Sequence, residues 1–397
     1  MSCVNVPYSE LEDRLNRFRK NMDNLNPEWK ICAIFGKVNQ FYFTGTMQNG
    51  VLIIPRDSEA LFFVRKSYHR ALEESEFPQI KPIKSFSETE KEIKTDKDVI
   101  YVEKESLPIA HFERFNKHLG FRDTASLDVA LLKTRALKSD FEVILIKKAG
   151  EIHYNAMEKK APAFLSEGVS EAEFGSDLIR EMIRLGHHGV TRLGTYNAEL
   201  YLGNISFGDS GNYYSSFDGP AGLRGFSPAV PLLGSFEKKL QKNSVALADT
   251  GCCYCGYYTD KTTIYSLGKI PAIVYDYHKK CVEIQNKTAE LLKPGETVGS
   301  VYEKVMKMVD DDFNKDFMGF GPNKVKFLGH GIGLVIDEYP AIAKGFNEEI
   351  RENMVFAIEP KKGIKDFGMV GIENTFLITD KGSVSLTGDK DEIIKVD

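Results

Sequence analysis

The chain has 397 residues, which is too many for one ordinary hydrophobic core and predicts two domains. Its 42% hydrophobic and 27% charged residues are typical of a globular protein, and a formal net charge of −5 argues against nucleic acid as a partner. No apolar run approaches the roughly 20 residues that span a bilayer, and no signal peptide is visible. We therefore expect a cytoplasmic protein with no membrane partner.

The first 136 residues alternate helix-like and strand-like stretches. Residues 11–22 have helical periodicity, and short buried strands are predicted at 31–35, 51–54, 60–64 and 99–102. Such alternation predicts a smaller N-terminal α/β domain, residues 1–136.

The pattern changes in residues 137–397. Ser139 with Glu142, and Ser170 with Glu173, each have the spacing of a capping box that begins a helix. Gly186 is placed to end the second of these helices. Residues 190–234 are rich in Gly, Tyr, Ser and Pro, which favours strands and loops.

Two further helices are predicted nearer the C-terminus. Pro271 opens a long one, and Thr297 caps another that we expect to reach about residue 312. Helices combined with strands that carry acidic residues predict an α+β fold for residues 137–397.

Six cysteines in a chain of this length do not suggest a disulfide scaffold and favour reduced thiols. Cys252, Cys253 and Cys255 lie close together, but no second pair follows at the spacing of a zinc ribbon. We favour cysteine as an apolar core residue over a zinc or redox site.

Four acidic residues fall inside or at the ends of apolar, strand-like runs: Asp249, Asp260, Glu359 and Glu373. Asp and Glu are disfavoured in strands and are rarely buried without partners. A single case would be a salt bridge or a turn, but four in one domain predict a bound cation.

The spacings support convergence of these side chains. A hairpin turn at Cys255-Gly256 would place Asp249 and Asp260 on adjacent strands. Residues 361–363 are the expected turn between the strands of Glu359 and Glu373, and their lysines are read as solvated. His330 lies between glycines that allow close approach of the backbone.

Four carboxylates and one imidazole form a mainly oxygen site, which suits Mn²⁺, Co²⁺, Zn²⁺ or Fe²⁺. Charge balance favours two divalent metal ions, with Mn²⁺ our first choice, because four carboxylates at close range repel one another strongly. Two ions about 3.5–4 Å apart can share a hydroxide that is nucleophilic at neutral pH.

These motifs resemble the pita-bread metallopeptidases, the family of methionine aminopeptidase, Xaa-Pro aminopeptidase, prolidase and creatinase. The resemblance rests on the D-x-G…G-Y-x-x-D-x-T stretch, the glycine-flanked histidine and the two glutamate strands, at residues 249–262, 329–333, 355–360 and 371–374. Residues 1–136 are similar to the creatinase-type N-terminal domain, and residues 135–149 to the family's entry helix.

The resemblance implies a pita-bread catalytic domain with Asp249 and Asp260 on one ion, His330 and Glu359 on the other, and Asp260 and Glu373 bridging. A homodimer is implied by the resemblance alone.

The chain departs from the family where substrate-handling histidines are expected. Asp337 stands where one histidine normally precedes E-x-P, and we assign it a catalytic role. We assign a catalytic role to Glu359 as well. Asp218 and Arg224 are expected to set the polarity of the substrate pocket. His187 and His188 are further candidates for substrate binding, with a helix C-terminal cap as their alternative reading.

Three functions are compatible with these residues. The first is an Xaa-Pro aminopeptidase or dipeptidase acting on a small peptide. The second is a metal-dependent hydrolase or lyase of a small non-peptide molecule, which the missing histidines favour. The third is a binding module without catalysis, which the presence of all five metal ligands disfavours.

Overall fold

The computed structural model describes the whole chain except residues 1–4, 94–95, 196–197, 216–217, 389 and 397. The chain divides into two compact units, Met1–Arg135 and Ala136–Asp397. This division lies one residue before the boundary expected from the sequence.

The first unit is built on a six-stranded mixed sheet in the order β4-β3-β2-β1-β5-β6. Its strands are β1 (Ile31–Ile34), β2 (Asn49–Pro55), β3 (Leu61–Lys66), β4 (Ile80–Pro82), β5 (Val99–Val102) and β6 (Asp123–Ser126). Its helices are α1 (Tyr8–Leu25), α2 (Lys37–Thr44), α3 (Tyr68–Glu74), α4 (Ile109–Leu119) and α5 (Asp128–Ala136). Ile53, Phe63 and Ile100 from the sheet pack with Phe115 of α4 in one core.

The second unit contains two larger sheets and two short hairpins. The first sheet has the order β19-β9-β8-β7 and the second β13-β12-β14-β17-β18. The strands are β7 (Gly203–Phe207), β8 (Ser244–Tyr254), β9 (Tyr257–Leu267), β10 (Gly319–Phe320), β11 (Asn323–Lys324), β12 (Phe327–Gly331), β13 (Glu338–Ala343), β14 (Val355–Ile358), β15 (Lys361–Ile364), β16 (Gly368–Gly371), β17 (Asn374–Thr379), β18 (Gly382–Ser385) and β19 (Ile394–Val396).

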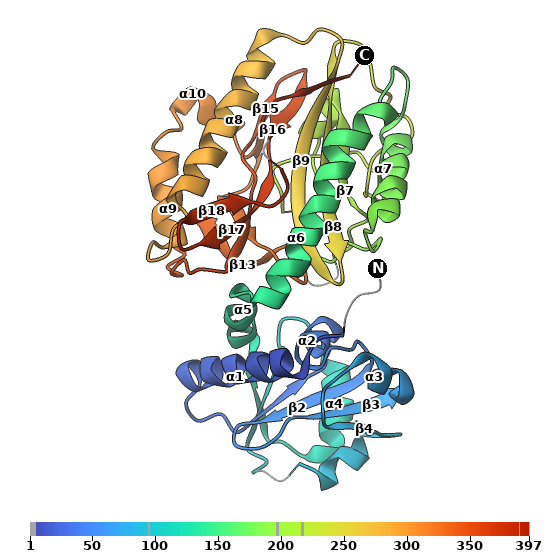
Figure 1. Cartoon of the computed structure of the whole chain (residues 1–397), viewed down its shortest axis with the longest axis vertical. Coiled ribbons are helices and arrows are strands. Elements are labelled where there is room, and N and C mark those ends of the chain that lie inside the picture. The colour runs from blue at the N-terminus through green and yellow to red at the C-terminus, as the bar shows by residue number, and fades with distance from the viewer. Residues whose placement is uncertain (1–4, 94–95, 196–197, 216–217, 389, 397) are drawn as a thin grey trace. The chain divides into compact units, whose positions relative to one another are not determined.

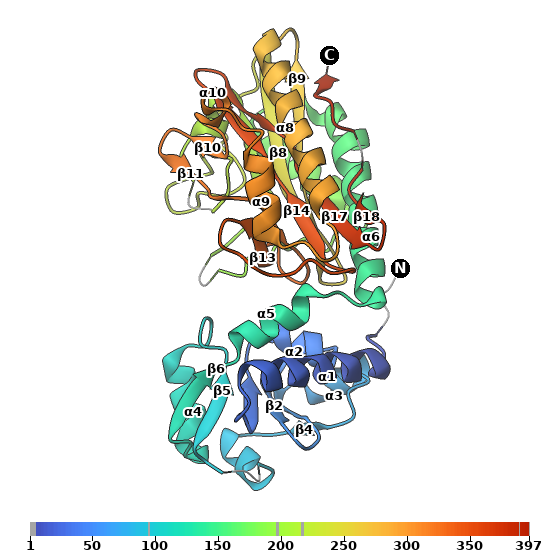
Figure 2. The same ribbon diagram turned by 90° about the vertical axis from the view of Figure 1, so that its left-hand side faces the viewer.

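Each larger sheet is covered by its own helices, which are α6 (Asp140–Tyr154), α7 (Glu171–Leu185), α8 (Ala272–Leu291), α9 (Val298–Met306) and the short α10 (Asp311–Asn314). Helices α6 and α7 lie beside β7, β8 and β9 (Figure 1), where Ile152 and Phe174 pack on Tyr265. Helices α8 and α9 cover β14 (Figure 2), where Ile284 and Val301 pack near Phe356.

The predicted helix signals are confirmed at α6 and α7. Ser139 with Glu142, and Ser170 with Glu173, form reciprocal capping boxes, and Gly186 ends α7 in the left-handed conformation. The expected helix from Thr297 to about residue 312 is wrong in extent. It ends at Met306, because Asp310 caps a separate short helix by accepting a hydrogen bond from Phe313 N.

Cys252 and Cys253 are buried and free, as expected for apolar core residues. Cys255 is disulfide-bonded, so the expectation of reduced thiols is wrong at that position. Among the described helices, none is long and apolar enough to cross a membrane.

Candidate metal centre

The β8–β9 hairpin turns at Cys255-Gly256, as predicted, and presents two carboxylates on one face. Asp249 pairs with Thr262 across the hairpin, and Asp260 pairs with Gly251. Residues opposite one another, and residues two apart on one strand, share a face of a sheet. Asp249 and Asp260 are therefore diagonal neighbours on that face.

Two glutamates lie where the second sheet meets this hairpin. Ile358 of β14 pairs with Asn374 of β17, so Glu359 and Glu373 flank the same end of that strand pair. Thr262 donates hydrogen bonds to Glu373 from its backbone N (3.2 Å) and from Oγ1 to Oε2 (2.9 Å). This contact joins the two sheets at the carboxylate cluster.

His330 enters the cluster from β12, and the glycines around it are required by close packing. A Cβ on Gly329 would lie 2.1 Å from the carbonyl oxygen of Ala357, and one on Gly331 would lie 2.5 Å from that of Tyr339. The Nδ1 atom of His330 lies 2.9 Å from the Gly331 carbonyl oxygen. Donation by Nδ1 leaves Nε2 with a lone pair for a cation.

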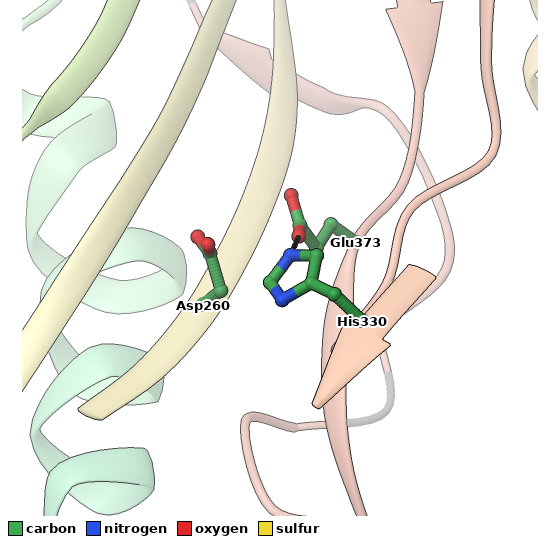
Figure 3. A group of neighbouring side chains, drawn as sticks. All are labelled: Asp260, His330 and Glu373. Carbon is green, nitrogen blue, oxygen red and sulfur yellow. Dashed lines mark ion pairs between the residues drawn. The ribbon is translucent and has the colours of Figure 1, made fainter. Parts of the chain in front are cut away.

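We call the group formed by Asp260, His330 and the Oε1 atoms of Glu359 and Glu373 the histidine pole. His330 Nε2 lies 3.6 Å from Glu359 Oε1 and 3.9 Å from Glu373 Oε1. Figure 3 shows the ring of His330, from β12, beside Asp260 of β9 and Glu373 of the segment between β16 and β17. One ligand atom from each of these three residues lies within 4.8 Å of the others.

The opposite side of the cluster, the lysine pole, consists of Lys361, Asp249 and the Oε2 atoms of both glutamates. Lys361 Nζ lies 2.9 Å from Glu359 Oε2, 2.9 Å from Glu373 Oε2 and 3.2 Å from Asp249 Oδ2. The Lys361 side chain is 0% exposed.

The predicted solvated turn at residues 361–363 is therefore wrong. These residues begin β15, which pairs with β16, and Lys361 stands opposite Gly371. The chain reverses only after Ile364. A pattern of Pro, Lys and Gly is typical of turns, but strand pairing and the carboxylate partners outweigh that local preference.

The pKa shifts of the cluster follow from burial and from the crowding of its charges. Burial raises the pKa of Asp249 to about 6, although Lys361 opposes the rise. Burial and the neighbouring Glu373 and Asp249 carboxylates raise the pKa of Asp260 well above its ordinary value. Burial lowers the pKa of Lys361, but Asp249, Glu359 and Glu373 outweigh it, and the pKa lies well above the usual value.

His330 is affected in the same way. Burial lowers its pKa, but Asp337, Glu359 and Glu373 attract the imidazolium more strongly and raise the pKa to about 8. Carboxylates that are buried this close together need cations between them. The histidine pole offers oxygen atoms and one imidazole nitrogen, a donor set that fits a divalent ion.

A cavity of about 160 Å³ opens onto the cluster. The predicted residues Asp218 and Asp337 line it together with Asp249, Asp260, His330, Glu359 and Glu373. Asp337 Oδ1 lies 3.3 Å from His330 Nε2, and the Asp337 side chain is 44% exposed. Among the described residues that line the cavity, His330 is the only histidine, and neither lysine nor arginine is present.

Three predicted substrate-binding residues lie elsewhere. Arg224 stacks over Tyr213, 4.7 Å from the ring centre, and pairs with Asp209 beside a separate cavity. His188 packs against Tyr254. None of them lines the cavity above the carboxylates.

His187 is also directed into the protein. Its Nδ1 accepts a hydrogen bond from Cys253 N (2.8 Å), and burial lowers its pKa to about 4. His187 follows the end of α7, and its backbone N donates to the carbonyl of Met182 in the last turn of that helix. This contact fits the helix-cap reading better than substrate binding.

A second buried lysine supports the carboxylate cluster and was not identified from the sequence. Lys261 Nζ pairs with Glu158 (3.1 Å) and donates to Asn374 Oδ1 (2.8 Å). Because Lys261 follows Asp260 and Asn374 follows Glu373, this bridge holds the backbone beside two carboxylates of the cluster. The signal available in the sequence was a lysine directly after Asp260, within a strand-like run rich in Tyr and Thr.

Comparison with known proteins agrees with this geometry. A sequence model of metallopeptidase family M24 matches residues 144–380, and a sequence model of the creatinase/prolidase N-terminal domain matches residues 14–137. An Xaa-Pro dipeptidase from Pyrococcus furiosus is 27% identical over 97% of this chain and 100% of its own length.

Solved structures are similar over nearly the whole chain. The prolidase from Pyrococcus horikoshii OT3 superposes with a TM-score of 0.80 at 25% identity, covering 96% of this chain and 100% of that one. An Xaa-Pro dipeptidase from Bacillus anthracis has the same fold, with a TM-score of 0.80 at 20% identity, covering 97% and 100%. The predicted pita-bread domain and creatinase-like N-terminal domain are confirmed, and the protein is a metal-dependent hydrolase. The chain belongs to metallopeptidase family M24.

Proposed function

We propose that this hydrolase cleaves the peptide bond that precedes proline near the N-terminus of short peptides, as an Xaa-Pro dipeptidase or aminopeptidase. The observation that carries the proposal is the cluster of four carboxylates and His330 at the base of a small acidic cavity. The name of the full-length Pyrococcus furiosus relative supports the same substrate class.

The size and charge of the cavity support a small substrate with a free amino terminus. Its volume of about 160 Å³ is below the roughly 300–1,000 Å³ of pockets that hold drug-sized ligands. Asp218 and Asp337 at its wall would attract the N-terminal ammonium of a peptide. A divalent ion at the histidine pole would supply Lewis acidity and a water of lowered pKa.

The chain's own groups would divide the remaining work. Glu359 would help to hold the ion at the histidine pole, where its Oε1 lies 3.6 Å from His330 Nε2, while Lys361 donates a hydrogen bond to its Oε2. Asp337 would give or accept a proton at the cavity wall, in the place of the missing histidine. The predicted manganese ion, homodimer and cytoplasmic location stay predictions.

The test is release of proline and of the preceding residue by protein loaded separately with Mn²⁺, Co²⁺ and Zn²⁺. Leu-Pro and Leu-Pro-Gly would be compared with Leu-Ala and Leu-Ala-Gly. We expect turnover only before proline, with His330→Ala inactive and the exposed His118→Ala unchanged. Absence of Xaa-Pro cleavage with all three metals would refute the proposal.

A second candidate is a small cationic non-peptide substrate. It is favoured by the two acidic residues at the cavity wall and by the lack of a further histidine or any basic residue among the described lining residues. A panel of small cationic metabolites that raises the melting temperature and is then consumed would select this candidate. Stabilisation by Xaa-Pro peptides alone would reject it.

A further inference from the structure

Lys361, at the centre of the lysine pole, is not among the residues that the family resemblance implies. Three carboxylates, those of Asp249, Glu359 and Glu373, can place ligand atoms within 4.8 Å of one another, which is the geometry of a second cation position. Each of these three carboxylates also contacts Lys361 Nζ, at 2.9–3.2 Å. The lysine ammonium therefore lies among the same oxygen atoms that a second ion would need.

The coordination of this ammonium is complete. A lysine Nζ carries three N–H donors, and here it has three carboxylate neighbours. Two of the contacts are hydrogen bonds of 2.9 Å, to Glu359 Oε2 and Glu373 Oε2. The glutamates thus divide their oxygen atoms, with Oε1 toward His330 and Oε2 toward Lys361.

The aliphatic part of the Lys361 side chain passes through a narrow space, called the slot below, that Gly371 leaves open. Lys361 stands opposite Gly371 in the β15–β16 hairpin. A Cβ on Gly371 would come within 2.6 Å of Lys361 Cα and 2.9 Å of its Cγ. A glycine at this position leaves room for the lysine side chain to pass toward the carboxylates, and the residue is fully buried along its length.

We propose that the ammonium of Lys361 takes the second cation position, so that this chain binds one divalent ion, at the histidine pole, where the family resemblance implies two. A metal ion would have to lie about 2.0–2.2 Å from carboxylate oxygens, in the space that Nζ now fills. Lys361 thereby neutralises part of the carboxylate charge and positions Glu359 and Glu373 for the remaining ion.

Metal stoichiometry tests this inference without measuring turnover, so its outcome is separate from that of the proposed substrate. The full chain is freed of metal with chelator and titrated with Mn²⁺ by calorimetry at pH 8. Bound manganese is counted after desalting, and its electron paramagnetic resonance spectrum is recorded. We expect one ion per wild-type chain, with the spectrum of an isolated Mn²⁺.

Two variants separate the effect of the volume of the Lys361 side chain from the effect of its charge. Lys361→Ala removes both the ammonium and its stem, and we expect it to bind two ions whose spins are coupled. Lys361→Met removes the charge but fills the slot, and should keep a stoichiometry of one. Lys365→Ala is the matched control, because Lys365 is an exposed lysine four residues on in the same hairpin.

The wild-type measurement is decisive even if a variant does not fold. Two ions per wild-type chain would overturn the inference, as would no binding at all. One ion in both wild type and a folded Lys361→Ala variant would show that the lysine does not fill a second metal position, and would also overturn it.

Discussion

The two poles of the carboxylate cluster share Glu359 and Glu373 but are built differently. The histidine pole is bordered by the cavity and by the half-exposed Asp337. In the lysine pole, Lys361 is fully buried and does not line that cavity, although its partners Asp249, Glu359 and Glu373 do. Crowded carboxylates can be stabilised either by an exchangeable ion or by a covalently attached ammonium, and only the first leaves a position for chemistry. We therefore propose catalysis at the histidine pole and structural support at the lysine pole.

Removal of His330 should have the largest effect. His330→Ala deletes the one nitrogen ligand of the histidine pole, so we expect loss of both Mn²⁺ binding and metal-dependent turnover, with the fold retained. Calorimetry and peptide hydrolysis measure the two losses, and circular dichroism checks the fold. Mn²⁺ binding at wild-type affinity would place the ion elsewhere and remove the distinction between the poles.

Substitution of Asp337 should lower turnover without changing the number of bound ions. A positioned proton-transfer group contributes about 10²–10⁴-fold in rate, so Asp337→Asn should lower kcat within that range and leave the metal stoichiometry unchanged. Asp366→Asn, at an exposed carboxylate of the β15–β16 turn, is the control and should not change kcat. An unchanged kcat in Asp337→Asn would exclude this carboxylate from proton transfer.

Substitution of Lys361 should affect stability. Removing one partner from a buried ion pair typically costs about 3–5 kcal/mol, so Lys361→Met should lower the melting temperature of metal-free protein at pH 8. Mn²⁺ should restore stability to Lys361→Ala more fully than to Lys361→Met, since only the smaller side chain leaves room for an ion. Equal melting temperatures for wild type and Lys361→Met in chelator would contradict the structural role of this pole.

Metal binding at the histidine pole should depend on pH. Binding requires neutral His330, whose pKa without metal is about 8, so protons compete with the ion below that pH. The affinity for Mn²⁺ should fall about tenfold per pH unit between pH 8 and 6. Asp260 of the same pole, whose pKa burial and neighbouring carboxylates raise well above the ordinary value, should make the fall steeper. Calorimetry in buffers of different ionisation enthalpy would count the protons released, and a pH-independent affinity would rule out this competition.

The convergence of the five proposed ligands could be predicted from the sequence because they lie in local patterns that conflict with their surroundings. Asp249 and Asp260 are carboxylates in apolar strands joined by an evident turn, and His330 lies among glycines that require close packing. These conflicts depend on side chains only a few residues away, so they are visible without coordinates. The capping boxes at Ser139 and Ser170 were predictable for the same reason.

Lys361 shows what only the tertiary structure decided. Its local sequence is typical of a turn, and its partners Asp249 and Glu373 are 112 and 12 residues away in the chain. The same limit explains Arg224, His187 and His188, whose residue types suited a pocket but whose side chains contact other groups. The sequence alone indicated which carboxylates need a cation, because a charged residue within an apolar run conflicts with its neighbours in the chain. Which cation each carboxylate contacts depended on strand pairing over long distances.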